Sequence, residues 1–184
     1  MRRLLTIFPL ISFLIALSGC SSGSAGTTGK GGWEYRPLGI RMDIPAGWTA
    51  ESKKAVFFDS VTISRNNSSD AGIIITGPSP LVQAYFRFTR FKLVDYMDWT
   101  LKTFDTGFFE ISGKKEDKFN GMPAFEADLK LSTFLPGGSK VEGKSWFFAR
   151  GKRFYAVSYW LNDRIDYGNT LKKILSALDS MEFS

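Results

Sequence analysis

The stretch that says most about the fold is VEGKSWFFARGKRFYAVSYWL, residues 141–161. Residues 141–150 and 153–161 are rich in aromatic and β-branched residues, which favour strands, and only Gly151 and Lys152 separate the two runs. This layout predicts a β-hairpin. Within its second strand, Tyr155 and Val157 should face one side of the sheet, and Phe154 and Ala156 the other. Core packing is the simplest interpretation of all four side chains.

Residues 33–184 supply the other strands of this predicted sheet. Residues 39–45 and 122–132 alternate apolar and polar residues, as half-buried strands do, and residues 72–77 (GIIITG) are typical of an interior strand. Residues 55–60 and 61–65 predict two short strands or one bent strand. Further candidates are a strand at 108–112, a charged hairpin or loop at 114–118 (KKEDK), and a short final strand or tail at 181–183.

Two segments have the period of amphipathic helices. Residues 92–104 (KLVDYMDWTLKTF) repeat apolar residues at steps of three and four, and so do residues 165–178. Asp163 or Asn162 could cap the start of the second helix. Helices that interrupt antiparallel strands predict the α+β class, with an antiparallel β-sheet packed between or against α-helices.

The first nineteen residues have the layout of a secretory signal. Arg2 and Arg3 form a positive start, residues 4–16 (LLTIFPLISFLIA) are apolar and too short for a good membrane span, and LSGC follows. This ending, with small residues leading directly to Cys20, resembles the lipobox of bacterial lipoproteins. The resemblance implies removal of residues 1–19 and acylation of Cys20. An ordinary secreted protein with a free thiol, or an uncleaved anchor, is the alternative.

Residues 20–32 predict a lipidated cysteine followed by a flexible Gly/Ser-rich tether. Twelve such residues have a root-mean-square span of roughly 19 Å. Ser21 stands where an Asp would be the common signal for inner-membrane retention in enteric-type bacteria. The lipoprotein resemblance therefore implies an extracytoplasmic location in the cell envelope, with the outer membrane favoured if the organism has one.

The composition excludes several classes of chemistry. The chain has no histidine and one cysteine, which excludes His-based triads, His-rich metal sites and an intramolecular disulfide. Removal of Arg2 and Arg3 lowers the net charge from +6 to +4, a mild excess that favours anionic surfaces slightly and does not argue for nucleic acid. No metal or cofactor is expected, and no catalytic residue is assigned.

The run AYFRFTRFK, residues 84–92, is the most unusual surface candidate. It interleaves aromatic and basic residues, and Arg87, Phe88, Arg90 and Lys92 could bind a polyanion or seat the domain on lipid headgroups. The alternative is a strand with Phe in the core and Arg in water. Carboxylate pairs at Asp95 and Asp98, and at Glu116 and Asp117, are best interpreted as solvated charges, because a catalytic pair needs a pocket as well.

The order of several motifs resembles the PsbP/Mog-like superfamily. These motifs are IPAGW (44–48), VFFDS (56–60), GIIITG, LVDYMDWTLKTF (93–104), NGMPAFEADLKL (120–131), GKRFYAVSYW (151–160) and ILSALDSMEF (174–183). The resemblance covers residues 33–183 and implies an αβα sandwich with binding or assembly roles rather than catalysis. The superfamily includes an extrinsic subunit of the oxygen-evolving complex and many bacterial lipoproteins. The cation roles of its photosynthetic branch do not carry over, since no metal-binding histidine is present.

The function expected from these observations is that of a lipid-anchored, non-catalytic binding or assembly module of the envelope. Acylated Cys20 would insert into membrane lipid, and an unspecified protein or envelope component would bind the domain at residues 33–184. A carrier of an apolar ligand is the first alternative, suggested by the 17 Phe residues. A hydrolase with serine or carboxylate chemistry is the less favoured second alternative.

Overall fold

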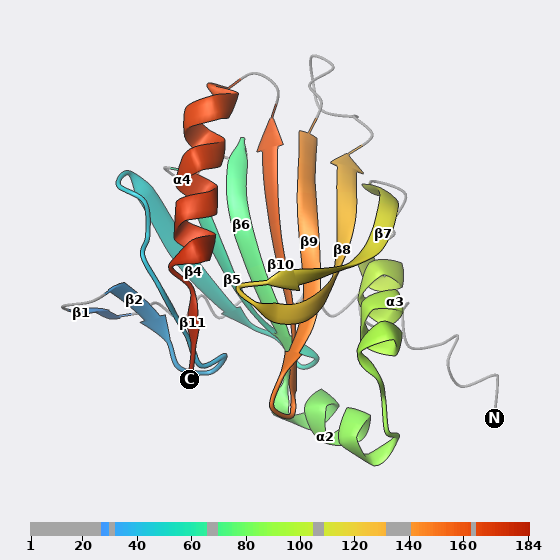
Figure 1. Cartoon of the computed structure of the whole chain (residues 1–184). Helices are drawn as coiled ribbons and strands as arrows, with labels where there is room; N and C mark the ends of the chain where they lie inside the picture. Colours follow the sequence, from blue (N-terminus) through green and yellow to red (C-terminus); the bar gives the residue numbers. More distant parts are fainter. Residues whose placement is uncertain (1–26, 30–31, 66–69, 105–108, 132–140, 163–164) are drawn as a thin grey trace.

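A computed structural model describes residues 27–29, 32–65, 70–104, 109–131, 141–162 and 165–184. Its main sheet has seven antiparallel strands in the order β4-β5-β6-β10-β9-β8-β7 (Figure 1). The strands are β4 (Trp48–Lys54), β5 (Phe58–Arg65), β6 (Ala71–Pro78), β7 (Phe109–Phe119), β8 (Met122–Leu131), β9 (Val141–Arg150) and β10 (Arg153–Asn162).

A smaller sheet and three helices complete the described fold. The smaller sheet has the order β1-β2-β3-β11, with β1 (Thr27–Gly29), β2 (Gly32–Tyr35), β3 (Ile40–Met42) and β11 (Glu182–Phe183). The helices are α2 (Pro80–Phe88), α3 (Leu93–Phe104) and α4 (Tyr167–Asp179). Strand β1 and Gly32 lie within the range that the sequence assigns to the tether. Residues 20–26 lie outside the described part of the chain.

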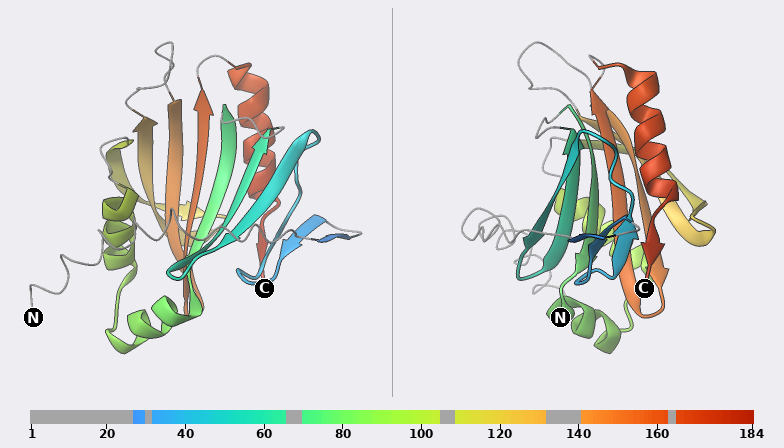
Figure 2. Two further views of the ribbon diagram at one scale, coloured as in Figure 1. Left: turned by 180° about the vertical axis from the view of Figure 1, so that it is seen from behind. Right: turned by 90° about the vertical axis from the view of Figure 1, so that its left-hand side faces the viewer.

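The main sheet carries apolar side chains on both faces. One face packs with α4 in the first cluster, which includes Val61, Ile63, Ile73, Ile75, Tyr155, Val157, Ile174 and Leu178. The other face packs with α2 and α3 in the second cluster, which contains Val82, Phe86, Tyr96, Met97, Leu101, Ala127, Phe147 and Ala156. The side view in Figure 2 shows α4 against one face of the sheet and α2 at its end. The architecture is therefore α+β, with helices on both faces of an antiparallel sheet.

The hairpin predicted for residues 141–161 is confirmed. Strands β9 and β10 pair from Arg150 and Arg153 through to Val141 and Asn162. Tyr155 and Val157 belong to the first cluster, whereas Ala156 belongs to the second and Phe154 packs against it. The predicted strand at 39–45, the strand at 122–132 and the helix at 92–104 correspond to β3, β8 and α3.

Two predicted boundaries are wrong. Residues 114–118 (KKEDK) are not a hairpin or loop but part of β7, which pairs with β8 as far as Phe119 and Met122. A strongly charged strand is stable there because β7 is at the edge of the sheet, where charged side chains remain in water. Helix α4 begins at Tyr167, and its cap is Asp166 rather than Asn162, which ends β10. Asp163 and the predicted turns at 66–69 and 135–139 lie outside the described residues.

Candidate ligand-binding surface

Helix α2 contains most of the run that the sequence singles out. The alternative of a strand at residues 84–92 is wrong, because residues 80–88 are helical. Ser79 caps the helix by accepting a hydrogen bond from the backbone N–H of Val82 at 3.5 Å, and Pro80 follows at the first helical position. Pro suits this position because its fixed φ is helical and its missing N–H would have no partner there.

A Schellman motif ends α2. The backbone N–H of Phe91 donates to the carbonyl of Phe86 at 2.9 Å, and the N–H of Arg90 donates to the carbonyl of Arg87 at 3.3 Å. Arg90 has a φ of 55°, in the left-handed region where glycine is usual. The rings of Phe86 and Phe91 stack at 4.3 Å, which is the hydrophobic contact that accompanies such motifs. The turn therefore fixes Arg90 at the end of α2.

Helix α2 has an inner face that holds it to the sheet. Val82, Gln83 and Phe86 are buried there. The Phe86 ring lies edge-on to Trp99 at 5.2 Å and to Phe154 at 6.0 Å. These contacts tie α2 to α3 and to β10.

The outer face of α2 is also apolar. Leu81, Tyr85 and Phe88 are 69%, 57% and 89% exposed, and their spacing of four and three residues places them on one side of the helix. Arg87, Arg90 and Lys92 are exposed at its C-terminal end. We call these six residues the α2 surface. The four residues predicted from sequence, Arg87, Phe88, Arg90 and Lys92, are thus all exposed, and Leu81 and Tyr85 are exposed on the same helix.

The basic residues of the α2 surface keep their charges available to solvent. Among the described residues, no carboxylate forms an ion pair with Arg87, Arg90 or Lys92. Asp95 is near in sequence, and its side chain accepts a hydrogen bond from the backbone N–H of Lys92 at 2.9 Å, so it serves the start of α3. The surface is therefore both apolar and cationic.

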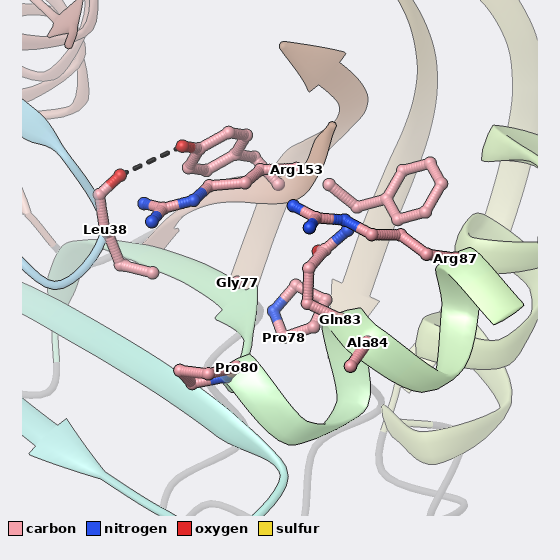
Figure 3. A pocket seen from close by; sticks show the side chains of 10 residues that line it. Leu38, Gly77, Pro78, Pro80, Gln83, Ala84, Arg87 and Arg153 are labelled. Atoms are coloured by element: carbon pink, nitrogen blue, oxygen red, sulfur yellow. Dashed lines mark hydrogen bonds between the residues drawn. The ribbon is translucent and has the colours of Figure 1, made fainter. Parts of the chain in front are cut away.

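A small pocket lies between α2 and the start of β10 (Figure 3). Its volume is about 160 Å³, and its lining includes Arg87, Arg153, Gln83, Leu38, Pro78 and Phe154. In Figure 3, Arg87 extends from α2 above Gln83, and Arg153 extends on the opposite side toward Leu38. Sequence reasoning missed Gln83 and Arg153, because no local pattern connects residues 83 and 153.

The other residues singled out from the sequence lie apart from the α2 surface or outside the described part of the chain. Cys20 lies outside the described residues. Asp98 pairs with Lys114 at 3.2 Å, and Asp117 lies on β7. Within the described ranges, no three residues of the types that bind metals are grouped to hold an ion. No described helix has the length and apolar character needed to cross a membrane.

Comparisons with known proteins show the fold. The solution structure of cyanobacterial PsbP (CyanoP) from Synechocystis sp. PCC 6803 matches with a TM-score of 0.52 at 13% identity, over 88% of this chain and 98% of that chain. The chain has a PsbP-like fold. No protein-family profile matches it, and a search of curated proteins finds no match.

Two further solved structures are similar at lower scores. A protein from Bacteroides thetaiotaomicron VPI-5482 matches with a TM-score of 0.47 at 13% identity, over 79% of this chain and 45% of that one, so the chain spans less than half of it. A protein of unknown function from Pseudomonas aeruginosa, described as a putative regulator, matches with a TM-score of 0.44 at 11% identity, over 77% of this chain and 94% of that one.

Proposed function

We propose that this protein is a lipid-anchored component of the cell envelope whose domain is a non-catalytic binding module. In this proposal acylated Cys20 is the anchor, and the α2 surface docks the domain on an anionic membrane surface. The observation that carries the docking step is the pairing of exposed Leu81, Tyr85 and Phe88 with Arg87, Arg90 and Lys92.

The chemistry of the α2 surface suits a lipid interface. Apolar side chains on an interfacial helix enter the boundary between headgroups and acyl chains, while basic side chains attract anionic lipids. Each basic residue close to an anionic bilayer contributes about 1 kcal/mol at moderate ionic strength. Three basic residues with three apolar ones support weak, salt-sensitive docking that a covalent anchor would make persistent.

The short chain between Cys20 and strand β1 limits where the anchor can lie. Strand β1 begins at Thr27, and Figure 1 shows it below the middle of the molecule at the left edge, with α2 at the bottom. Six residues lie between Cys20 and Thr27, and the seven steps from one to the other span at most about 25 Å when the chain is extended. An anchor at Cys20 is therefore compatible with α2 facing the same bilayer.

The anchor is tested by metabolic labelling. Cells that express the full chain are grown with radioactive palmitate, and label is expected on the wild type but not on Cys20→Ala. Absence of label from the wild type, or label that survives Cys20→Ala, would contradict lipidation.

Docking is tested by co-sedimentation with vesicles that contain anionic lipid, using residues 21–184, which keep every described element. The variant Phe88→Ser/Arg90→Ala should reduce binding at least tenfold. A matched variant on α4, Leu175→Ser/Lys173→Ala, alters one exposed apolar and one exposed basic residue on another face and should bind like the wild type. Equal loss in both variants, or no preference for anionic vesicles, would overturn the docking step.

The alternative functions gain less support from the described residues. A volume of about 160 Å³ is below the roughly 300 Å³ at which ligand pockets usually begin, so the pocket does not suit a large apolar cargo. Its lining contains no serine and no carboxylate, so the pocket offers no group for the serine or carboxylate chemistry of the hydrolase alternative.

A further inference from the structure

The pocket between α2 and β10 combines two cations with a buried polar group. Gln83 and Arg87 come from α2, one turn apart, whereas Arg153 comes from the first position of β10. Apolar groups of Leu38, Pro78 and Phe154 form part of the wall. Three segments of the chain are therefore needed to build it.

Gln83 has a fixed orientation and an unused acceptor. Its side chain is 6% exposed, and its Nε2 donates to the carbonyl of Lys152 in the β9–β10 turn. Because Nε2 is committed to that carbonyl, the amide cannot turn over without losing the bond. The Oε1 atom is buried and has no hydrogen-bond donor among the described residues. A buried acceptor without a donor is costly, so a ligand with a donor would relieve it.

The two arginines are not neutralised to the same degree. Arg87 forms no ion pair with a described carboxylate. Arg153 donates to the carbonyl of Pro37 at a long 3.4 Å, and its charge lowers the pKa of nearby Asp59, although burial of that carboxyl is the larger effect and raises it. Arg87 therefore has an uncompensated charge, and Arg153 a partly compensated one.

We propose that this pocket binds a phosphate group through Arg87 and Arg153, with a hydrogen-bond donor of the ligand directed to Oε1 of Gln83. Two guanidinium groups balance a phosphate dianion and offer paired N–H donors that match its oxygens. A cavity of about 160 Å³ admits such a group and a few neighbouring atoms. The phosphate could belong to a soluble monoester or to a lipid headgroup. The site shares Arg87 with the α2 surface but does not depend on membrane docking.

The probe for this site is phenyl phosphate, titrated by calorimetry into the full chain in a neutral detergent at about pH 6, where about half of the ligand carries a P–OH that can donate to Oε1 of Gln83. Arg87→Ala and Arg153→Ala should each raise the dissociation constant at least tenfold, and Arg87→Lys should recover only part of the loss, because a lysine lacks the paired donors. Arg90→Ala and Lys92→Ala lie outside the pocket lining and should stay within twofold of the wild type. Circular dichroism of each variant checks that the fold is retained.

Three results would overturn the proposal. These are no heat of binding at millimolar phenyl phosphate, equal or tighter binding of benzoate, and equal weakening in Arg90→Ala and Arg87→Ala. Asp59→Asn gives an independent arm, since removal of the carboxylate near Arg153 should tighten binding about threefold or more, and weaker binding would count against the site.

Two soluble ligands distinguish between a soluble phosphate monoester and a lipid headgroup as the natural ligand. Glycerol 3-phosphate and a short-chain phosphatidic acid below its micelle concentration are compared under the same conditions, and the tighter one identifies the source. The variant Phe88→Ser, which removes an apolar contact from the α2 surface only, should leave phenyl phosphate binding intact. If the wild type binds phenyl phosphate but not anionic vesicles, the docking proposal alone fails. If it binds anionic vesicles but not phenyl phosphate, the pocket proposal alone fails.

Discussion

Arg90 lowers the stability of the fold while it contributes a positive charge to the α2 surface. Its φ of 55° costs a non-glycine residue about 1–2 kcal/mol, and glycine at that position of a Schellman motif has no such penalty. We expect Arg90→Gly to raise the free energy of unfolding by about 1 kcal/mol, measured by urea denaturation. The same variant should bind anionic vesicles more weakly, because it removes a cation from the α2 surface.

The control for this prediction is Ala84→Gly. Ala84 is exposed within α2 and has no positive φ, so glycine there should lower the free energy of unfolding by about 1 kcal/mol. If Arg90→Gly were no more stable than the wild type, the strain assigned to this turn would be absent.

Asp59 gives a second residue-scale prediction, about pH. The carboxyl is buried on β5, and burial raises its pKa above the ordinary value of 3.8 despite the opposing charges of Lys54 and Arg153. A raised carboxyl pKa means that the folded state binds the proton more tightly than the unfolded state does. The stability associated with the protonated form is therefore present below about pH 3.8 and is lost as pH rises through the folded pKa.

Asp59→Asn should consequently be more stable than the wild type at pH 7, and the difference should shrink as pH falls through the raised folded pKa toward 3.8. Thermal unfolding between pH 3 and 7 measures it. Glu51→Gln on the neighbouring β4 removes an exposed carboxylate and should change stability by less than about 0.5 kcal/mol. A destabilised Asp59→Asn at pH 7 would show that the charged form is favoured by its neighbours.

At the scale of elements, glycines have opposite roles in strand β9 and helix α4. A Cβ on Gly143 would collide with the carbonyl oxygen of Tyr159 on β10, whereas a Cβ on Gly168 would meet nothing within 4 Å. Gly143→Ala should therefore lower the free energy of unfolding by about 2–3 kcal/mol. Gly168→Ala should raise it by about 0.5–1 kcal/mol, because alanine has the better helix propensity.

Chemical denaturation of the two alanine variants provides the comparison, with one substitution acting as the control of the other. The opposite sign for either variant would contradict the packing inferred for its element.

Helix α3, which has one apolar face, was predicted from the sequence, whereas helix α2, which has two, was missed. Helix α3 separates apolar from charged residues, and its period is readable. Helix α2 is apolar both inside, at Val82 and Phe86, and outside, at Leu81, Tyr85 and Phe88, and the alternation of Phe and Arg at its end resembles a strand. The sequence signal for α2 was its start, where Ser79 is a typical N-cap residue and Pro80 is typical of the first helical position.

The candidate site divides along similar lines. Arg87, Phe88, Arg90 and Lys92 were found because they are close in sequence, where an aromatic and basic run is visible. The pocket was not predicted. Gln83 and Arg153 line it together only because β10 pairs with β6 and because Gln83 is hydrogen-bonded to the turn at Lys152. Burial of an acceptor is likewise a property of packing, and no local pattern reports it.

The whole molecule is organised around a sheet that two hydrophobic clusters share. Phe183, at the end of the chain, packs with Phe148 at 5.2 Å and Tyr155 at 5.1 Å on the first face. Phe86 packs with Phe91 and Trp99 on the second face. The two clusters have no residue in common, although both depend on β10.

This separation predicts additive energetics. Phe183→Leu and Phe86→Leu should each lower the free energy of unfolding by about 1–2 kcal/mol, and the double variant should show their sum within about 0.5 kcal/mol, as expected for sites without shared partners. Urea denaturation followed by both tryptophan fluorescence and circular dichroism measures the effects and tests for a single transition. A coupling above about 1 kcal/mol would mean that the sheet transmits packing changes from one face to the other. In that event ligand binding at the pocket beside α2 would also alter the face that packs against α4.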